Sequence, residues 1–153
     1  MTPAEEPPPF YRSPAAERRI ALIAQSYRRL LGRDLVPGPD DVLAALWRAP
    51  FAILAHGTEA DPVFFFGNRA ALRAFECDAD TFVQMPSRLS AEAPLREQRQ
   101  ALLDRVTQDG FITDYAGIRI SAKGRRFRIS GATVWNLMDS TGARFGQAAC
   151  FAV

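Results

Sequence analysis

The sequence predicts an α+β domain built on a five-stranded antiparallel sheet, with short helices on one side and an amphipathic helix at the N-terminus. Three observations support this. Helical periodicity marks the first part of the chain, two short apolar runs flank a Gly/Asp/Pro turn, and the last third alternates apolar and polar residues between two further turns. The 153 residues, 48% hydrophobic and 24% charged, fit one globular domain.

The N-terminal part divides into a tail and two helices. Residues 1–13 hold four of the eleven prolines and no apolar periodicity, so we expect a flexible, Pro-rich tail. Helices are expected over residues 14–48: Ser13 caps the first, Gly32 ends it, and Asp40 or Asp41 caps a second through Trp47.

The first helix carries an apolar stripe at spacings of three, four, three and one, which places its members on one face. The stripe consists of Ile20, Ile23, Tyr27, Leu30 and Leu31. Two interpretations remain open. The stripe packs on its own domain, or it also pairs with a partner or a second copy of the chain.

Residues 49–153 are expected to form the core domain. The apolar runs 51–55 and 63–66 predict an antiparallel hairpin around the polar turn 56–62. Asn68 is a candidate cap for the next helix, and Asp78 or Asp80 for a short helical turn after it.

A longer helix and three strands complete the predicted order. The helix begins near Pro94 and ends at Gly110. Strands are expected over 111–121, 125–137 and 145–153, separated by turns at Lys123-Gly124 and at residues 139–142.

Five stretches carry a family resemblance: residues 56–62, 67–72, 86–89, 119–121 and 132–137. On these stretches, and in its element order, the chain resembles the MEKHLA family. This is a PAS-like group of short bacterial proteins, also found at the end of plant class III homeodomain–leucine zipper proteins. The resemblance runs from about residue 18 to the end of the chain and implies a PAS-like fold.

PAS-like domains enclose a cavity between one sheet face and the short helices, so the resemblance implies a small-molecule site there. The candidate pocket residues are His56, Asn68, Tyr115, Phe127, Trp135, Asn136 and Gln147. An apolar pocket with a few placed polar groups suits ligand recognition, although the same aromatic residues could fill the core completely. The cofactor is unknown. We expect no flavin–cysteine photochemistry, because the residues flanking Cys77 do not match that motif, and no haem, because His56 follows the first strand.

Two other functions have weaker support. A small enzyme could use the turn that holds His56 and Asp61, but no nucleophile accompanies them and we assign no catalytic residue. A nucleic-acid contact could use the basic hairpin, where Arg119, Arg126 and Arg128 alternate with apolar residues and are expected to share the solvent face of the sheet. The cations of this hairpin are Arg119, Lys123, Arg125, Arg126 and Arg128. One histidine and two cysteines cannot build a metal cluster or a disulfide framework.

The sequence therefore predicts a non-enzymatic sensory or interaction domain that binds a small molecule or a partner protein, with a homodimer as one alternative. No stretch reaches the ~18–20 apolar residues of a membrane span, and no leader precedes the first helix, so we expect a cytoplasmic protein without membrane contact. Because the last predicted strand ends at residue 153, no output domain is expected.

Overall fold

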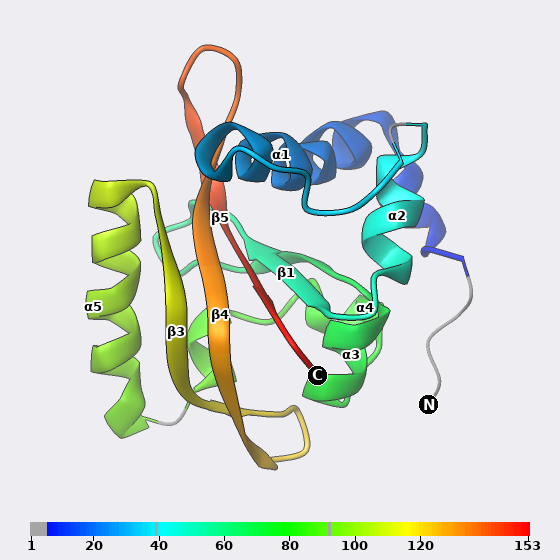
Figure 1. Ribbon diagram of the computed structural model, residues 1–153. Helices are drawn as coiled ribbons and strands as arrows, with labels where there is room; N and C mark the ends of the chain where they lie inside the picture. Colours follow the sequence, from blue (N-terminus) through cyan, green and yellow to red (C-terminus); the bar gives the residue numbers. More distant parts are fainter. Residues whose placement is uncertain (1–5, 39, 92) are drawn as a thin grey trace.

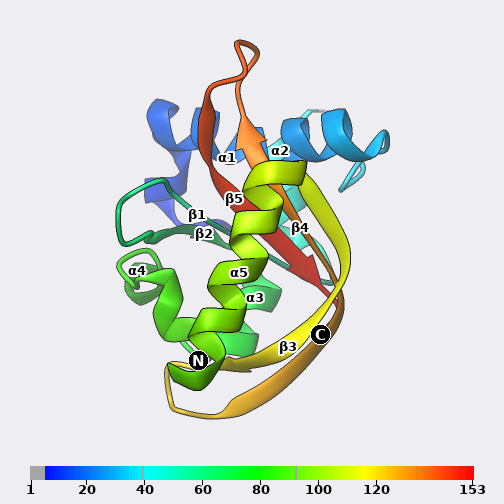
Figure 2. The ribbon, with the colours of Figure 1, turned by 90° about the vertical axis from the view of Figure 1, so that its left-hand side faces the viewer.

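The computed structural model describes residues 6–38, 40–91 and 93–153. A five-stranded sheet has helices on both faces (Figures 1 and 2). The elements are η1 (Pro9–Arg12), α1 (Pro14–Leu31), α2 (Val42–Arg48), β1 (Ala52–His56), β2 (Phe64–Gly67), α3 (Arg69–Phe75), α4 (Ala79–Phe82), η2 (Ser87–Ser90), α5 (Ala93–Asp109), β3 (Phe111–Ile120), β4 (Arg126–Met138) and β5 (Arg144–Phe151).

The strand order is β2-β1-β5-β4-β3, and every neighbouring pair is antiparallel. Two strands that lie far apart in the sequence meet at the centre of the sheet, where β5 pairs with β1. Figure 2 shows α5 crossing one face of the sheet while α1 lies on the other. The predicted five-stranded antiparallel α+β fold is confirmed.

The predicted helix caps are present because each cap is a local hydrogen bond. Ser13 Oγ accepts from Ala16 N at 3.2 Å, Asp41 caps α2, Asn68 caps α3 and Asp78 caps α4. Gly32 ends α1 in the left-handed conformation at φ 77°. The strands lie within two residues of their predicted bounds.

The expectation of a flexible tail over residues 1–13 is wrong for its described part, while residues 1–5 lie outside the described residues. Pro9–Arg12 form the 3₁₀ helix η1, and Tyr11 is buried. The Tyr11 hydroxyl accepts from Gly67 N at 3.1 Å and donates to Gly67 O at 3.3 Å. The proline-rich composition did not predict this attachment to the domain, because it depends on the contacts of a single residue, Tyr11.

The expectation that the stripe on α1 serves as a dimer surface is wrong for its central residues. Ile20, Ile23 and Tyr27 are buried on the sheet of their own chain. Leu30 and Leu31, at the end of the stripe, are half-buried against the same core. The stripe therefore packs on its own domain, which is the other interpretation of the pattern.

Two β-bulges shape the hairpin of β3 and β4. The pairing register shifts between Ile112 and Tyr115, and again between Tyr115 and Gly117. Asp114 and Gly131, at these shifts, both have φ 62°. The two register shifts cancel, so the strands pair regularly from Gly117 and Ile129 to the turn between β3 and β4.

The register of this hairpin corrects one expectation. Arg119 pairs with Phe127, and Ile118 pairs with Arg128. Arg119 therefore lies on the same face of the sheet as Phe127, the inner face that packs against α3 and α5. It does not join a row of cations on the solvent face. The connection between the strands sets this register, and the apolar alternation does not reveal it.

Among the described residues, no helix combines the length and the apolar character needed to cross a membrane.

Candidate functional site

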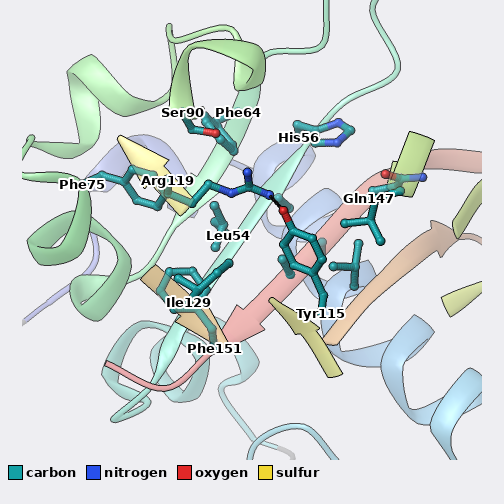
Figure 3. Close-up of a pocket in the computed structure, with 15 residues that line it drawn as sticks. Leu54, His56, Phe64, Phe75, Ser90, Tyr115, Arg119, Ile129, Gln147 and Phe151 are labelled. Carbon is teal, nitrogen blue, oxygen red and sulfur yellow. Dashed lines mark hydrogen bonds between the residues drawn. The ribbon is translucent and has the colours of Figure 1, made fainter. Parts of the chain in front are cut away.

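A cavity of about 50 Å³ lies between the inner face of the sheet and the helices that cover it (Figure 3). Its apolar lining comes from the strands, α3 and α5, and consists of Leu54, Phe64, Phe75, Leu102, Ile129, Val134 and Phe151, with alanines of β1 and β5. Polar groups reach it from four elements: His56 on β1, Ser90 on η2, Tyr115 and Arg119 on β3, and Gln147 on β5. A mostly apolar lining with a few convergent polar groups is typical of a ligand site.

Arg119 extends across this cavity, as Figure 3 shows. Its Nη2 donates to the Tyr115 hydroxyl at 2.7 Å, and its guanidinium lies 5.2 Å from the centre of the Tyr115 ring. Burial lowers the pKa of the Arg119 guanidinium, although Tyr115 acts in the opposite direction. An arginine remains charged despite such a shift, so the cavity holds a positive charge.

A glycine permits the contact between Tyr115 and Arg119. Residues 115, 117 and 119 share one face of β3, because strand side chains alternate. A Cβ on Gly117 would lie 2.5 Å from the Tyr115 hydroxyl. The missing side chain leaves the space through which the Tyr115 hydroxyl reaches the guanidinium four residues later.

His56 lines the cavity, but the structure does not combine it with Asp61. The His56 ring is buried, and its Nδ1 lies 2.9 Å from Gly57 O. The Asp61 carboxylate is exposed, and Arg88 Nε lies 3.1 Å from both of its oxygens. The acid–base pair required by the enzyme alternative is therefore absent.

Gln147 connects the cavity to α5. Its buried side-chain amide donates to Thr107 Oγ1 at 3.2 Å and to Asn136 Oδ1 at 3.1 Å. Asn136 Nδ2 in turn donates to Val106 O at 2.9 Å. Asn136, a predicted pocket residue, thus fastens the end of α5 to the sheet and does not line the cavity.

Three other predicted pocket residues lie elsewhere. Trp135 is on the opposite face, where its Nε1 donates to Ile23 O of α1 at 3.1 Å. Asn68 is buried and uses its amide to join α2, β1 and α3. Phe127 lies near the start of β4, where it packs against Phe75 and Phe151 and lines a surface groove. Of the predicted pocket residues, only His56, Tyr115 and Gln147 line the cavity.

Ser90 and Arg119 are the polar cavity residues that sequence reasoning missed, and the alternation along the hairpin predicted Arg119 on the solvent face. The signal for Arg119 was the sequence Tyr115-Ala-Gly117-Ile-Arg119, in which a tyrosine, a glycine and an arginine recur with the period of a strand. A glycine between two large side chains on one strand face indicates close approach.

Both thiols are free and lie outside the cavity lining. Burial raises the pKa of the Cys77 thiol to about 11 and also raises the pKa of Cys150. Both therefore remain protonated near neutral pH, which disfavours a role as nucleophile. Within the described ranges, no cluster of three His, Cys, Asp or Glu side chains could hold a metal ion.

A second concave surface is a groove of about 640 Å³ beside α3 and the end of β5. Five arginines line it, together with an apolar floor that includes Phe127, Phe151 and Val153. The arginines are Arg48, Arg69, Arg73, Arg125 and Arg128. Arg48 pairs with Glu6 and Arg125 pairs with Glu76, so part of this charge is neutralised within the chain.

The sequence profile of the MEKHLA domain matches residues 17–153. Two similar curated proteins are the Arabidopsis thaliana homeobox-leucine zipper proteins ATHB-9, 33% identical over 138 residues, and REVOLUTA, 31% identical over 149 residues. The matches cover 83% and 92% of this chain but 16% and 17% of those proteins. The chain therefore spans about one sixth of the length of the relatives it matches.

Solved structures of similar fold are PAS and LOV domains. A PAS domain from Colwellia psychrerythraea has a TM-score of 0.61 at 11% identity, covering 70% of this chain and 88% of that one. The LOV protein of Rhodobacter sphaeroides has a TM-score of 0.60 at 9% identity, covering 88% and 66%. The PAS domain of a LuxR-family transcriptional regulator from Burkholderia thailandensis, solved in complex with ethanol, has a TM-score of 0.52 at 17% identity, covering 69% and 91%. At these identities the likeness concerns the fold, which is PAS-like.

Proposed function

The chain belongs to the MEKHLA domain family and has a PAS-like fold, and on this premise we propose that it is a non-enzymatic sensory domain that binds a small molecule. The observation that carries the proposal is the cavity, where polar side chains from three strands and η2 converge in an apolar lining. Side chains that only filled a core would bring together fewer polar groups, because burying each one costs free energy.

The cavity volume limits the size of the ligand. A water molecule needs ~10–15 Å³ of such space, so about 50 Å³ accommodates a compound of only a few non-hydrogen atoms. Pockets for large cofactors occupy ~300–1,000 Å³. The complex of the Burkholderia thailandensis PAS domain with ethanol supports the idea that this fold can hold so small a molecule.

The contacts of Gln147 suggest how binding reaches the surface. A ligand that displaces the Gln147 amide weakens its hydrogen bonds to Thr107 and Asn136, which fasten the end of α5. Ligand binding would therefore shift the equilibrium between docked and loosened α5, by the difference in its affinity for the two states.

Native mass spectrometry of the purified protein tests the proposal. We expect an added small mass, or one regained after incubation with a set of compounds of a few non-hydrogen atoms. Ala149→Ile should abolish that mass because residue 149 lines the cavity, whereas Ala143→Ile, in the exposed turn before β5, should not. Retention of the added mass by Ala149→Ile would place the ligand elsewhere.

A second candidate function is contact with an acidic protein segment through the arginine-lined groove. The arginines that line the groove beside its apolar residues favour this function, because positive side chains attract an acidic segment. It ranks second because Glu6 pairs with Arg48 and Glu76 pairs with Arg125, which reduces the charge of the groove. Arg73→Glu, at a position that lines this groove but not the cavity, should weaken such binding and leave small-molecule binding unchanged.

A further inference from the structure

We propose that the ligand of this cavity is a small carboxylate anion, held by the guanidinium of Arg119; this inference rests on the proposed sensory function and names its ligand class. The side chain of Arg119 crosses the cavity, and among the described residues no aspartate or glutamate pairs with it. A cation in an apolar cavity is costly without a counter-charge, and a bound carboxylate supplies one.

The donor geometry also suits an anion. A guanidinium has five N–H donors, and Tyr115 is the one acceptor that Arg119 has among the described residues. The remaining donors can form the paired hydrogen bonds that planar carboxylates accept. Because the Tyr115 hydroxyl accepts from Arg119, its own proton is available to a ligand oxygen.

The size of the cavity restricts the carboxylate to a short chain. With space for only a few non-hydrogen atoms, the site fits a compound on the scale of acetate or propionate. The apolar side of such a ligand would face Leu54, Ile129 and Phe151, which lie across the cavity from Ser90 and Phe64 in Figure 3.

A surface groove that leads to the cavity also favours anions. A groove of about 570 Å³ runs between α5 and β3, and it shares Leu102, Tyr115 and Arg119 with the cavity. Arg105 and Arg128 also line this groove, and none of its described lining residues is acidic. Tyr115 and Arg119 thus lie where the groove meets the cavity, and the positive lining attracts anions to that point.

The test is a protein-observed NMR titration with propionate and with propionamide, its neutral counterpart of the same shape. We expect propionate to shift the Arg119 Nε–H signal and the backbone signals of Leu54 and Gln147. We expect its Kd to be at least tenfold lower than that of propionamide, which corresponds to about 1.4 kcal/mol.

Variants assign the effect to the charge at position 119. Arg119→Gln should lose the preference for propionate, and Arg119→Lys should retain it in part, because lysine keeps the charge without the planar fork. Arg119→Lys also gives the answer if Arg119→Gln fails to fold. Arg126→Gln, an equal loss of charge at an exposed position on the same hairpin, should bind propionate as the wild type does.

The outcomes separate this inference from the function on which it rests. If propionate and propionamide shift the cavity signals with equal Kd, the cavity binds small molecules without recognising charge, and the carboxylate assignment is overturned alone. If Arg119→Gln binds propionate as well as Arg126→Gln does, the assignment is likewise overturned. If neither compound shifts any cavity signal and native mass spectrometry finds no bound molecule, both proposals fail.

Discussion

The side-chain amide of Gln147 donates a hydrogen bond of 3.2 Å to the Thr107 hydroxyl, and so joins the central strand β5 to the last turns of α5. Gln147 also lines the cavity, whereas Thr107 is exposed on the outside of the fold. One side chain thus links the interior, where a ligand would bind, to a surface helix.

Replacing Gln147 with leucine should loosen α5. The change removes the donor to Thr107 and leaves the buried Asn136 Oδ1 without its hydrogen bond from residue 147, which costs about 1–3 kcal/mol. We expect lower stability to urea and faster amide hydrogen exchange in residues 102–109. Gln100→Leu, on the exposed face of α5, is the control. Equal exchange in the two variants would show that Gln147 does not fasten the helix.

The packing of α1 predicts how its apolar stripe responds to mutation. Ile23 is fully buried, so Ile23→Ala removes packed apolar atoms and should destabilise the fold by about 2–5 kcal/mol. Gln25→Ala, exposed on the same helix, should change stability little. Urea denaturation measures both. If Ile23→Ala instead halved the mass in solution while leaving stability unchanged, the stripe would be an intermolecular surface.

Asn68 is expected to behave as a structural residue. Its Oδ1 accepts from Ile53 N and Ala71 N at 3.0 Å, and its Nδ2 donates to Leu46 O and Phe51 O at 2.9 Å. Asn68→Ala leaves these four backbone groups, three of them buried and one partly buried, without the side chain's hydrogen bonds and should cost more than about 3 kcal/mol.

The matched control is Asp78→Ala, which removes the exposed cap of α4 and should cost about 0.5–2 kcal/mol. Thermal unfolding of the two variants compares them directly. Equal losses of stability would mean that Asn68 acts as an ordinary cap and does not join α2, β1 and α3.

The ion pair between Arg12 and Asp41 predicts a dependence on pH. Hydrogen bonds from the Arg12 guanidinium, each 3.0 Å long, hold the pKa of the Asp41 carboxyl below its usual value, and the Ala44 amide contributes. A carboxyl whose pKa is lowered by folding stabilises the protein fully above its unfolded-state pKa. This stabilisation disappears as the pH falls through the folded pKa.

Asp41→Asn keeps a good helix cap and removes the ion pair, so it isolates this effect. Because the pair is exposed, we expect a loss of about 0.2–1 kcal/mol at neutral pH that vanishes in strong acid. Urea denaturation across pH measures it, and Arg12→Gln should give the same profile. A difference that persisted in strong acid would assign the loss to the cap.

The elements that the sequence predicted well are those set by local chemistry. Ser13, Asp41, Asn68 and Asp78 each cap the helix expected of them, because a cap joins residues only three positions apart. The strands of the final meander were predictable because Lys123-Gly124 and residues 139–142 are strong turn signals.

The candidate site was less predictable because it depends on register and packing. Arg119 was placed on the wrong face, since the pairing of Ile118 with Arg128 cannot be read from the alternation of either strand alone. Trp135 was assigned to the pocket although its indole docks α1, because both faces of this sheet are covered and both require apolar residues. The cavity itself is a volume that only the packed side chains define.

The most direct test of a small-molecule site in the cavity is a ¹H–¹⁵N NMR screen of the wild type against compounds of a few non-hydrogen atoms. We expect at least one compound to shift signals of Tyr115, Arg119, Gln147 and the last turns of α5 together, and we expect Ala149→Ile to lose those shifts. If every shift mapped outside the cavity, or if Ala149→Ile responded as the wild type does, the cavity would not be the sensory site.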